Sequence, residues 1–118
     1  EEIVNKIRQL EKKPIQFSQA YNFGPQSEDA LPVEKMVNIS IESWGYGEYQ
    51  IEQEANQPYE AGLLKLDISK VYDELKWQPK MNATEAVSMT MHWYKEFYTN
   101  QYKISEYTNN QILRFFKG

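Results

Sequence analysis

Residues 82–98 have the sequence NATEAVSMTMHWYKEFY, and this stretch is the strongest indication of the fold. Residues at helical spacing would share one face of it: Val87, Thr90, Met91, Tyr94, Phe97 and Tyr98. Asn82 followed three residues later by Glu85 resembles a capping box, which starts many helices. A stripe of this kind predicts a long amphipathic helix over 82–98 that covers a core.

Two shorter helices are expected before this stretch. Pro32 suits a first helical turn, and the apolar residues that follow line one face up to Gly45. Asp67 can cap a helix that runs to Leu75, before a proline two residues past Trp77 stops it. Both patterns predict helices that contribute one apolar face to a core.

The two ends of the chain also have helical patterns. Residues 1 to about 12 are amphipathic and end before Pro14. Thr108 with Gln111 resembles a second capping box and predicts a closing helical turn up to Phe116. Because the chain opens directly in a helical pattern and without Met, we expect the true start of the protein to lie upstream.

The remaining segments suggest short strands. Residues 18–23 have a strand-like mixture that ends at Gly24-Pro25, and Tyr49 and Ile51 alternate with polar residues. The leucines at positions 63, 64 and 66 suggest a brief buried segment, and we interpret residues 52–58 as a loop. The expected fold class is therefore mixed α/β in one compact unit, with helices packed on a few short strands.

Composition and charge exclude several function classes. The 118 residues include 41% hydrophobic and 25% charged residues, which is typical of a globular domain. The formal charge is −4 without a dense basic cluster, so we do not expect nucleic-acid binding. The chain has no cysteine, no signal peptide and no apolar run of spanning length, so we expect a cytoplasmic location and no membrane partner.

Tyr72 and Lys76 have the Tyr-x-x-x-Lys spacing by which short-chain dehydrogenases put a phenol and an ammonium on one helical face. Here the pair stands at the end of a short helix, without the glycine-rich loop that would hold a dinucleotide phosphate. We therefore predict no catalytic residue in this chain.

The other short motifs have ordinary structural interpretations. Gly45 and Gly47 follow a helix instead of a strand, which indicates a helix stop and a turn. His92 is the single histidine, and it suits an ordinary helix position. Glu52 and Glu54 alternate on one face and are expected to be a solvated surface. We expect no metal site.

Several blocks in order carry a family resemblance. They are 21–25 (YNFGP), 28–33 (EDALPV), 44–45 (WG), 58–61 (PYEA), 64–67 (LKLD), 69–70 (SK), 75–79 (LKWQP) and 93–95 (WYK). Together they resemble the second half of CDP-glucose 4,6-dehydratases, members of the extended short-chain dehydrogenase/reductase family. The similarity runs from about residue 17 to about residue 98.

The resemblance implies a role in a larger enzyme. Residues 1–118 would be the carboxy-terminal, nucleotide-sugar-binding portion of a lyase that converts CDP-glucose to CDP-4-keto-6-deoxyglucose. The amino-terminal Rossmann domain, which holds NAD and the catalytic groups in that family, is absent from this chain, so the chain alone would be inactive. The parent would be a homo-oligomer that supplies deoxysugars for bacterial surface polysaccharide such as O-antigen.

Tyr59 and Glu60 are the predicted substrate contacts, because they stand in the block that the family places at the nucleotide-sugar cleft. Tyr59 offers a ring and a hydroxyl, and Glu60 can accept hydrogen bonds from base or ribose donors. The alternative is that Glu60 only fixes the loop.

Three departures from the family pattern have consequences. Tyr59 and Gly62 replace two histidines, which affects base or sugar preference. Lys76 stands where the family has glycine after the helix, so we expect the helix to end differently there. Two other functions stay open: a different nucleotide-sugar dehydratase or epimerase, and a non-catalytic binding module.

Overall fold

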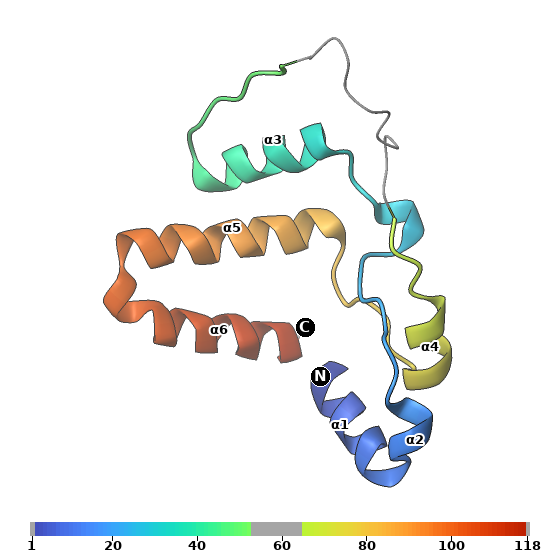
Figure 1. Cartoon of the computed structure of the whole chain (residues 1–118). Coiled ribbons are helices and arrows are strands. Elements are labelled where there is room, and N and C mark those ends of the chain that lie inside the picture. The colour runs from blue at the N-terminus through green and yellow to red at the C-terminus, as the bar shows by residue number, and fades with distance from the viewer. Residues whose placement is uncertain (1, 53–64, 118) are drawn as a thin grey trace. The chain divides into compact units, whose positions relative to one another are not determined.

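The computed structural model describes residues 2–52 and 65–117 (Figure 1). The chain forms two compact units, one from residues 2–30 with 65–82 and the other from residues 31–52 with 83–117. The elements in chain order are α1 (Glu2–Lys12), α2 (Pro14–Phe17), η1 (Ser27–Asp29), α3 (Val33–Trp44), α4 (Ser69–Leu75), α5 (Ala83–Thr99), η2 (Gln101–Lys103) and α6 (Ile104–Lys117).

The expected α/β class is wrong, because every regular element within the described ranges is helical. Residues 18–23 and the segment around Tyr49 and Ile51 form no strand there, and a strand requires a partner with which to share a hydrogen-bond ladder. Two carbonyls of the first segment accept from lysines instead: Lys6 Nζ donates to Gln19 O at 2.9 Å, and Lys70 Nζ donates to Ala20 O at 3.0 Å. Leu66 is exposed rather than buried, and Leu63 and Leu64 lie outside the described residues.

The first unit is built around a small apolar cluster. Phe17 of α2 and Val71 and Leu75 of α4 are buried, and Val71 has no exposed surface. Four half-buried side chains pack against the cluster: Leu10, Tyr21, Ile68 and Trp77. The helical spacing of Val71 and Leu75 explains why α4 contributes two residues from one face.

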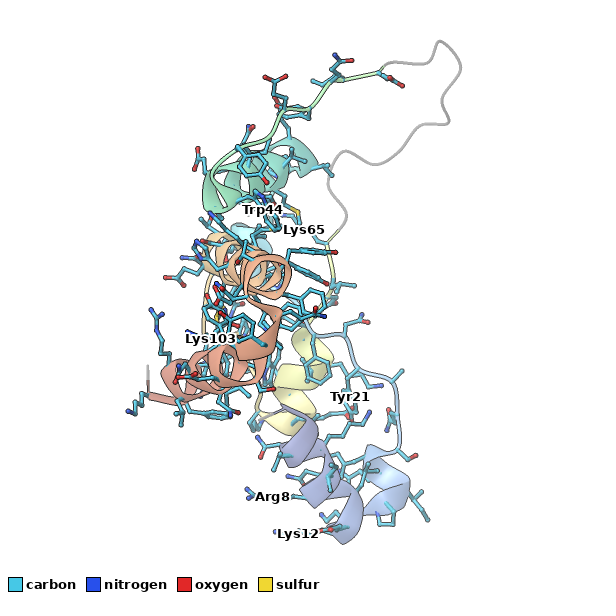
Figure 2. The ribbon with its side chains drawn as sticks, turned by 90° about the vertical axis from the view of Figure 1, so that its left-hand side faces the viewer. Arg8, Lys12, Tyr21, Trp44, Lys65 and Lys103 are labelled. Carbon is cyan, nitrogen blue, oxygen red and sulfur yellow. The ribbon has the colours of Figure 1, made fainter. Side chains whose placement is uncertain are left out.

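Tyr21, which is labelled in Figure 2, connects α1 and α4 of the first unit. Its hydroxyl donates to Glu74 Oε2 at 2.5 Å, and the ammonium groups of Lys6 and Lys70 lie 4.8 and 4.9 Å from its ring centroid. The hydrogen bond to Glu74, with smaller effects of desolvation and of the Glu74 charge, raises the pKa of Tyr21 to about 12. The phenol therefore stays protonated, and can donate to Glu74, up to a higher pH than an ordinary tyrosine.

The second unit is a helical assembly in which α5 contacts both α3 and α6 (Figure 1). The Lys95 ammonium donates to the Trp44 carbonyl at the end of α3, and the Gln111 amide donates to the Met89 carbonyl of α5 at 3.0 Å. On α5 itself the rings of Trp93 and Phe97 stack, with centroids 5.5 Å apart. The predicted helix over 82–98 is confirmed as α5.

The closing helix is longer than expected, and the predicted capping box at Thr108 is wrong. Thr108 lies inside α6, where its hydroxyl donates to the Ile104 carbonyl one turn earlier, at 2.7 Å. The same hydroxyl accepts the Trp93 indole N–H at 2.9 Å, which joins α6 to α5. Tertiary contact therefore occupies the side chain that the sequence pattern assigned to a cap.

Helix endings in both units depend on the left-handed backbone region. Gly45 ends α3 at φ 102°, and its N–H donates to the Ile41 carbonyl at 2.8 Å, which confirms the predicted stop. Lys76 ends α4 at φ 55° and ψ 29°, so the expectation that this helix ends differently from a glycine cap is wrong. The backbone adopts the left-handed cap although a side chain is present.

We expect Lys76→Gly to stabilise the first unit by about 0.5–1 kcal/mol, because glycine removes the Cβ clash of the left-handed region. The measurement is amide exchange of α4 in increasing urea. Lys76→Ala is the matched control, since it also removes the ammonium, which lies 5.9 Å from the Tyr72 ring centroid, but keeps the Cβ. Equal gains in both variants would contradict the backbone explanation.

None of the described helices is both long and apolar enough to cross a membrane.

Candidate functional site

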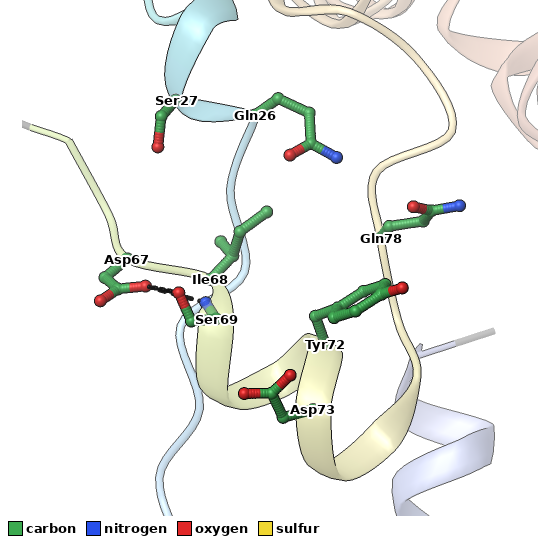
Figure 3. A pocket seen from close by; sticks show the side chains of 8 residues that line it. All are labelled: Gln26, Ser27, Asp67, Ile68, Ser69, Tyr72, Asp73 and Gln78. Carbon is green, nitrogen blue, oxygen red and sulfur yellow. Dashed lines mark hydrogen bonds between the residues drawn. The ribbon is translucent and has the colours of Figure 1, made fainter.

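A polar cleft of about 520 Å³ lies within the first unit (Figure 3). Eight residues from three segments line it: Gln26, Ser27, Asp67, Ile68, Ser69, Tyr72, Asp73 and Gln78. Gln26 and Ser27 face the start of α4 across the cleft, and Tyr72 and Gln78 lie at one side of it (Figure 3). The volume is within the range of small-molecule sites, and the polar groups converge from different parts of the chain.

Hydrogen bonds at the start of α4 fix the position of one wall of the cleft. Asp67 Oδ1 accepts the Ser69 backbone N–H at 2.8 Å and the Ser69 hydroxyl at 2.6 Å, as the dashed lines in Figure 3 show. Asp67 therefore caps α4, as the sequence predicts, from one residue before the helix boundary at Ile68. The hydroxyl of Ser69, and then its N–H, hold the pKa of Asp67 below its ordinary value of 3.8, while desolvation opposes them.

We expect Ser69→Ala to raise the pKa of Asp67 part of the way back, because the hydroxyl is the largest cause of the shift and the N–H remains. A lowered carboxyl pKa adds stability above the unfolded-state pKa and loses it as the pH falls through the folded-state pKa. The variant should therefore lose less stability on acidification than the parent. The pKa of Asp67 is measured from its carboxyl carbon chemical shift as a function of pH. Ser27→Ala, which removes another hydroxyl of the cleft, is the control. An equal change in the pKa of Asp67 in both variants would contradict the role of the Ser69 hydroxyl.

The rest of the lining supplies free polar groups and one aromatic ring. Within the described residues, no hydrogen bond occupies the Asp73 carboxylate or the side-chain amides of Gln26 and Gln78. The Tyr72 side chain is 50% exposed. Lys76 does not line the cleft, but its ammonium lies 5.9 Å from the centroid of the Tyr72 ring. The arrangement is suited to binding through hydrogen bonds and ring contact.

A second cavity, of about 490 Å³, lies within the second unit and is mostly apolar. Its lining residues come from α3, the segment after it and α5: Val33, Met36, Val37, Ser40, Ile41, Trp44, Tyr46, Glu48 and Met91. It has few polar groups with which to orient a ligand, so the polar cleft is the better candidate site.

The predicted substrate residues Tyr59 and Glu60 lie outside the described residues, as does Glu54. His92 occupies an exposed helical position, as predicted, and Glu52 is exposed. In residues 2–52 and 65–117 no group of His, Cys, Asp and Glu side chains could hold a metal ion.

The sequence interpretation missed most of the cleft. Asp67 was expected as a helix cap and as part of the 64–67 family block, and Tyr72 as part of a dehydrogenase-like motif. The close spacing of Asp67 and Ser69 at the start of α4 was a local signal that could have predicted one wall of the cleft. Gln26 and Gln78 had no signal, because nothing local to a glutamine indicates that a distant segment faces it.

Comparisons with known proteins give one relationship and one negative result. The chain matches no known protein-family profile. It is 36% identical over 88 residues to the CDP-glucose 4,6-dehydratase of Salmonella typhimurium, a match that includes 75% of this chain and 24% of that protein. The matched region is thus about a quarter of the length of the curated relative. Over this region the chain is related to a nucleotide-sugar dehydratase.

Proposed function

We propose that this chain is the substrate-side portion of a CDP-glucose 4,6-dehydratase-like enzyme and that it binds and orients the nucleotide sugar. The observation that carries the proposal is the match to a CDP-glucose 4,6-dehydratase over 88 residues. Short motifs recur by chance, whereas identity spread over most of a chain points to common ancestry. Binding and orientation lower the barrier by holding reacting groups in a productive geometry, which is the task left to a portion without catalytic groups.

The proposal divides the reaction between two parts of a larger protein. NAD and the groups that act on the sugar would belong to the part outside this chain, and Tyr59 and Glu60 would contact the nucleotide sugar in this part. The polar cleft supports a binding role, because it offers donors, acceptors and an aromatic ring. We propose a cytoplasmic, homo-oligomeric parent.

Calorimetry on the 118-residue chain tests this function with CDP-glucose and NAD as ligands. We expect CDP-glucose to bind, NAD not to bind, and CDP-glucose to remain unconverted, because the cofactor and catalytic groups would lie elsewhere. CDP and UDP-glucose report the contributions of the base and the sugar. Binding of NAD, turnover by the chain alone or failure to bind any nucleotide sugar would contradict the proposal.

A further inference from the structure

The contacts of α6 with α5 use one face of α6 and leave another face exposed (Figure 1). Thr108 and Gln111 are hydrogen-bonded to residues of α5, which places their side of α6 against that helix. Three apolar side chains of α6 are about half exposed: Ile112 at 47%, Leu113 at 55% and Phe116 at 52%. Phe116 is three residues after Leu113 and four after Ile112, so the three share one surface, which we call the outer face of α6.

The charges of α6 are divided between its two ends. Glu106 is in the first turn, whereas Arg114 and Lys117 are in the last turn. Leu113 is seven residues after Glu106 and four before Lys117, so both charged side chains lie along the same edge of the outer face. A second copy of α6 that runs antiparallel complements this pattern, because each end then meets the opposite charge. A parallel copy would bring like charges together.

We propose that the outer face of α6 binds the outer face of α6 in a second copy of this chain, in antiparallel orientation. If Glu106 of one copy is level with Lys117 of the other, the midpoint of the pair lies between Gln111 and Ile112. The two Leu113 side chains are then three residues, or about 4.5 Å, apart along the helix axis, and they meet at the centre. This inference gives a surface to the homo-oligomer proposed above, and it is independent of the ligand.

The size of the outer face predicts a weak contact. A helix of 14 residues is about 21 Å long, and one pair of such helices buries less than the roughly 1,200 Å² at the low end of stable interfaces. Sedimentation velocity of the 118-residue chain from about 10 μM to 1 mM measures the association. We expect the apparent mass to rise from one copy towards two, and added salt to reduce this rise, because salt screens exposed charges.

Two charge reversals test the orientation. Glu106→Lys alone and Lys117→Glu alone should each weaken self-association about five- to thirtyfold, because both pairs of charges then repel each other. An equimolar mixture of the two variants should form a mixed dimer about as stable as the parent dimer, since every pair is again of opposite charge. A mixture that associates no more than either variant alone would overturn the antiparallel pairing.

Leu113→Asn tests the apolar contact, and Ile7→Asn of α1 is the matched control, because Ile7 is 50% exposed. We expect Leu113→Asn to weaken self-association about tenfold or more and Ile7→Asn to leave it unchanged. Unchanged amide exchange of α5 and α6 confirms that each variant is folded. Loss of association in Ile7→Asn but not in Leu113→Asn would place the interface on α1 and contradict the proposal. A parent chain that stays monomeric up to 1 mM would also overturn it, and the outer face would then be a contact for a part of the protein outside this chain.

Discussion

Leu75→Ala is expected to lower the free energy of unfolding of the first unit by about 2–5 kcal/mol, through lost burial and the cavity left behind. The side chain is 6% exposed and belongs to a buried cluster of three residues, with Phe17 and Val71. A core of this size buries little apolar area, so the loss of one side chain removes a large part of its stabilisation. We therefore expect α4 to lose most of its protection from amide exchange.

Ile15→Ala is the matched control for this prediction, because Ile15 is 95% exposed and belongs to the same unit. An exposed substitution of this kind should change stability by about 0.5 kcal/mol or less. Hydrogen exchange of α4 in urea, read by mass spectrometry, measures both variants. A loss in Ile15→Ala as large as that in Leu75→Ala would show that Leu75 is not a core residue.

Tyr59→Ala in a full-length enzyme containing this chain is expected to raise the dissociation constant of CDP-glucose about five- to a hundredfold. The reason is the loss of a stacking face, typically worth about 1–3 kcal/mol per base. NAD affinity and the melting temperature should barely change, because the proposed contact is to the nucleotide sugar alone. Calorimetry with each ligand and thermal melting provide the measurements.

Glu60→Gln keeps the shape of the neighbouring side chain and removes its charge, so it separates electrostatics from hydrogen bonding. An unchanged CDP-glucose affinity together with a large loss of stability in either variant would show that the segment is structural. The assignment of Tyr59 and Glu60 as substrate contacts would then be wrong.

The helices α3 and α5 were predictable from the sequence almost to their ends. Their apolar stripes have helical periodicity, and a local signal, Gly45, ends α3. The sequence predicted that α4 ends at Leu75, which is confirmed, but it did not predict the left-handed backbone of Lys76, because lysine rarely adopts that region.

The expected strands show the limit of local patterns. Residues 18–23 have strand-like composition, but a strand forms only with a partner, and within the described residues their carbonyls at positions 19 and 20 accept from Lys6 and Lys70. Thr108 is a similar case: its capping-box spacing is real, but α6 begins at Ile104, and the Thr108 hydroxyl contacts Trp93 and the Ile104 carbonyl instead. In both cases residues distant in sequence decided the outcome.

By itself the sequence determined the positions of the main helices and the relationship to a nucleotide-sugar dehydratase, because periodicity, caps and ordered motifs are local properties. Only the tertiary structure decided which polar residues share a cleft. Gln26 is distant in sequence from Asp73 and Gln78. The three line one cavity because Tyr21 and Trp77 pack against the same apolar cluster as Val71 and Leu75 of α4. Burial of apolar area is non-directional and independent of sequence separation, so it creates such sites without any local signal.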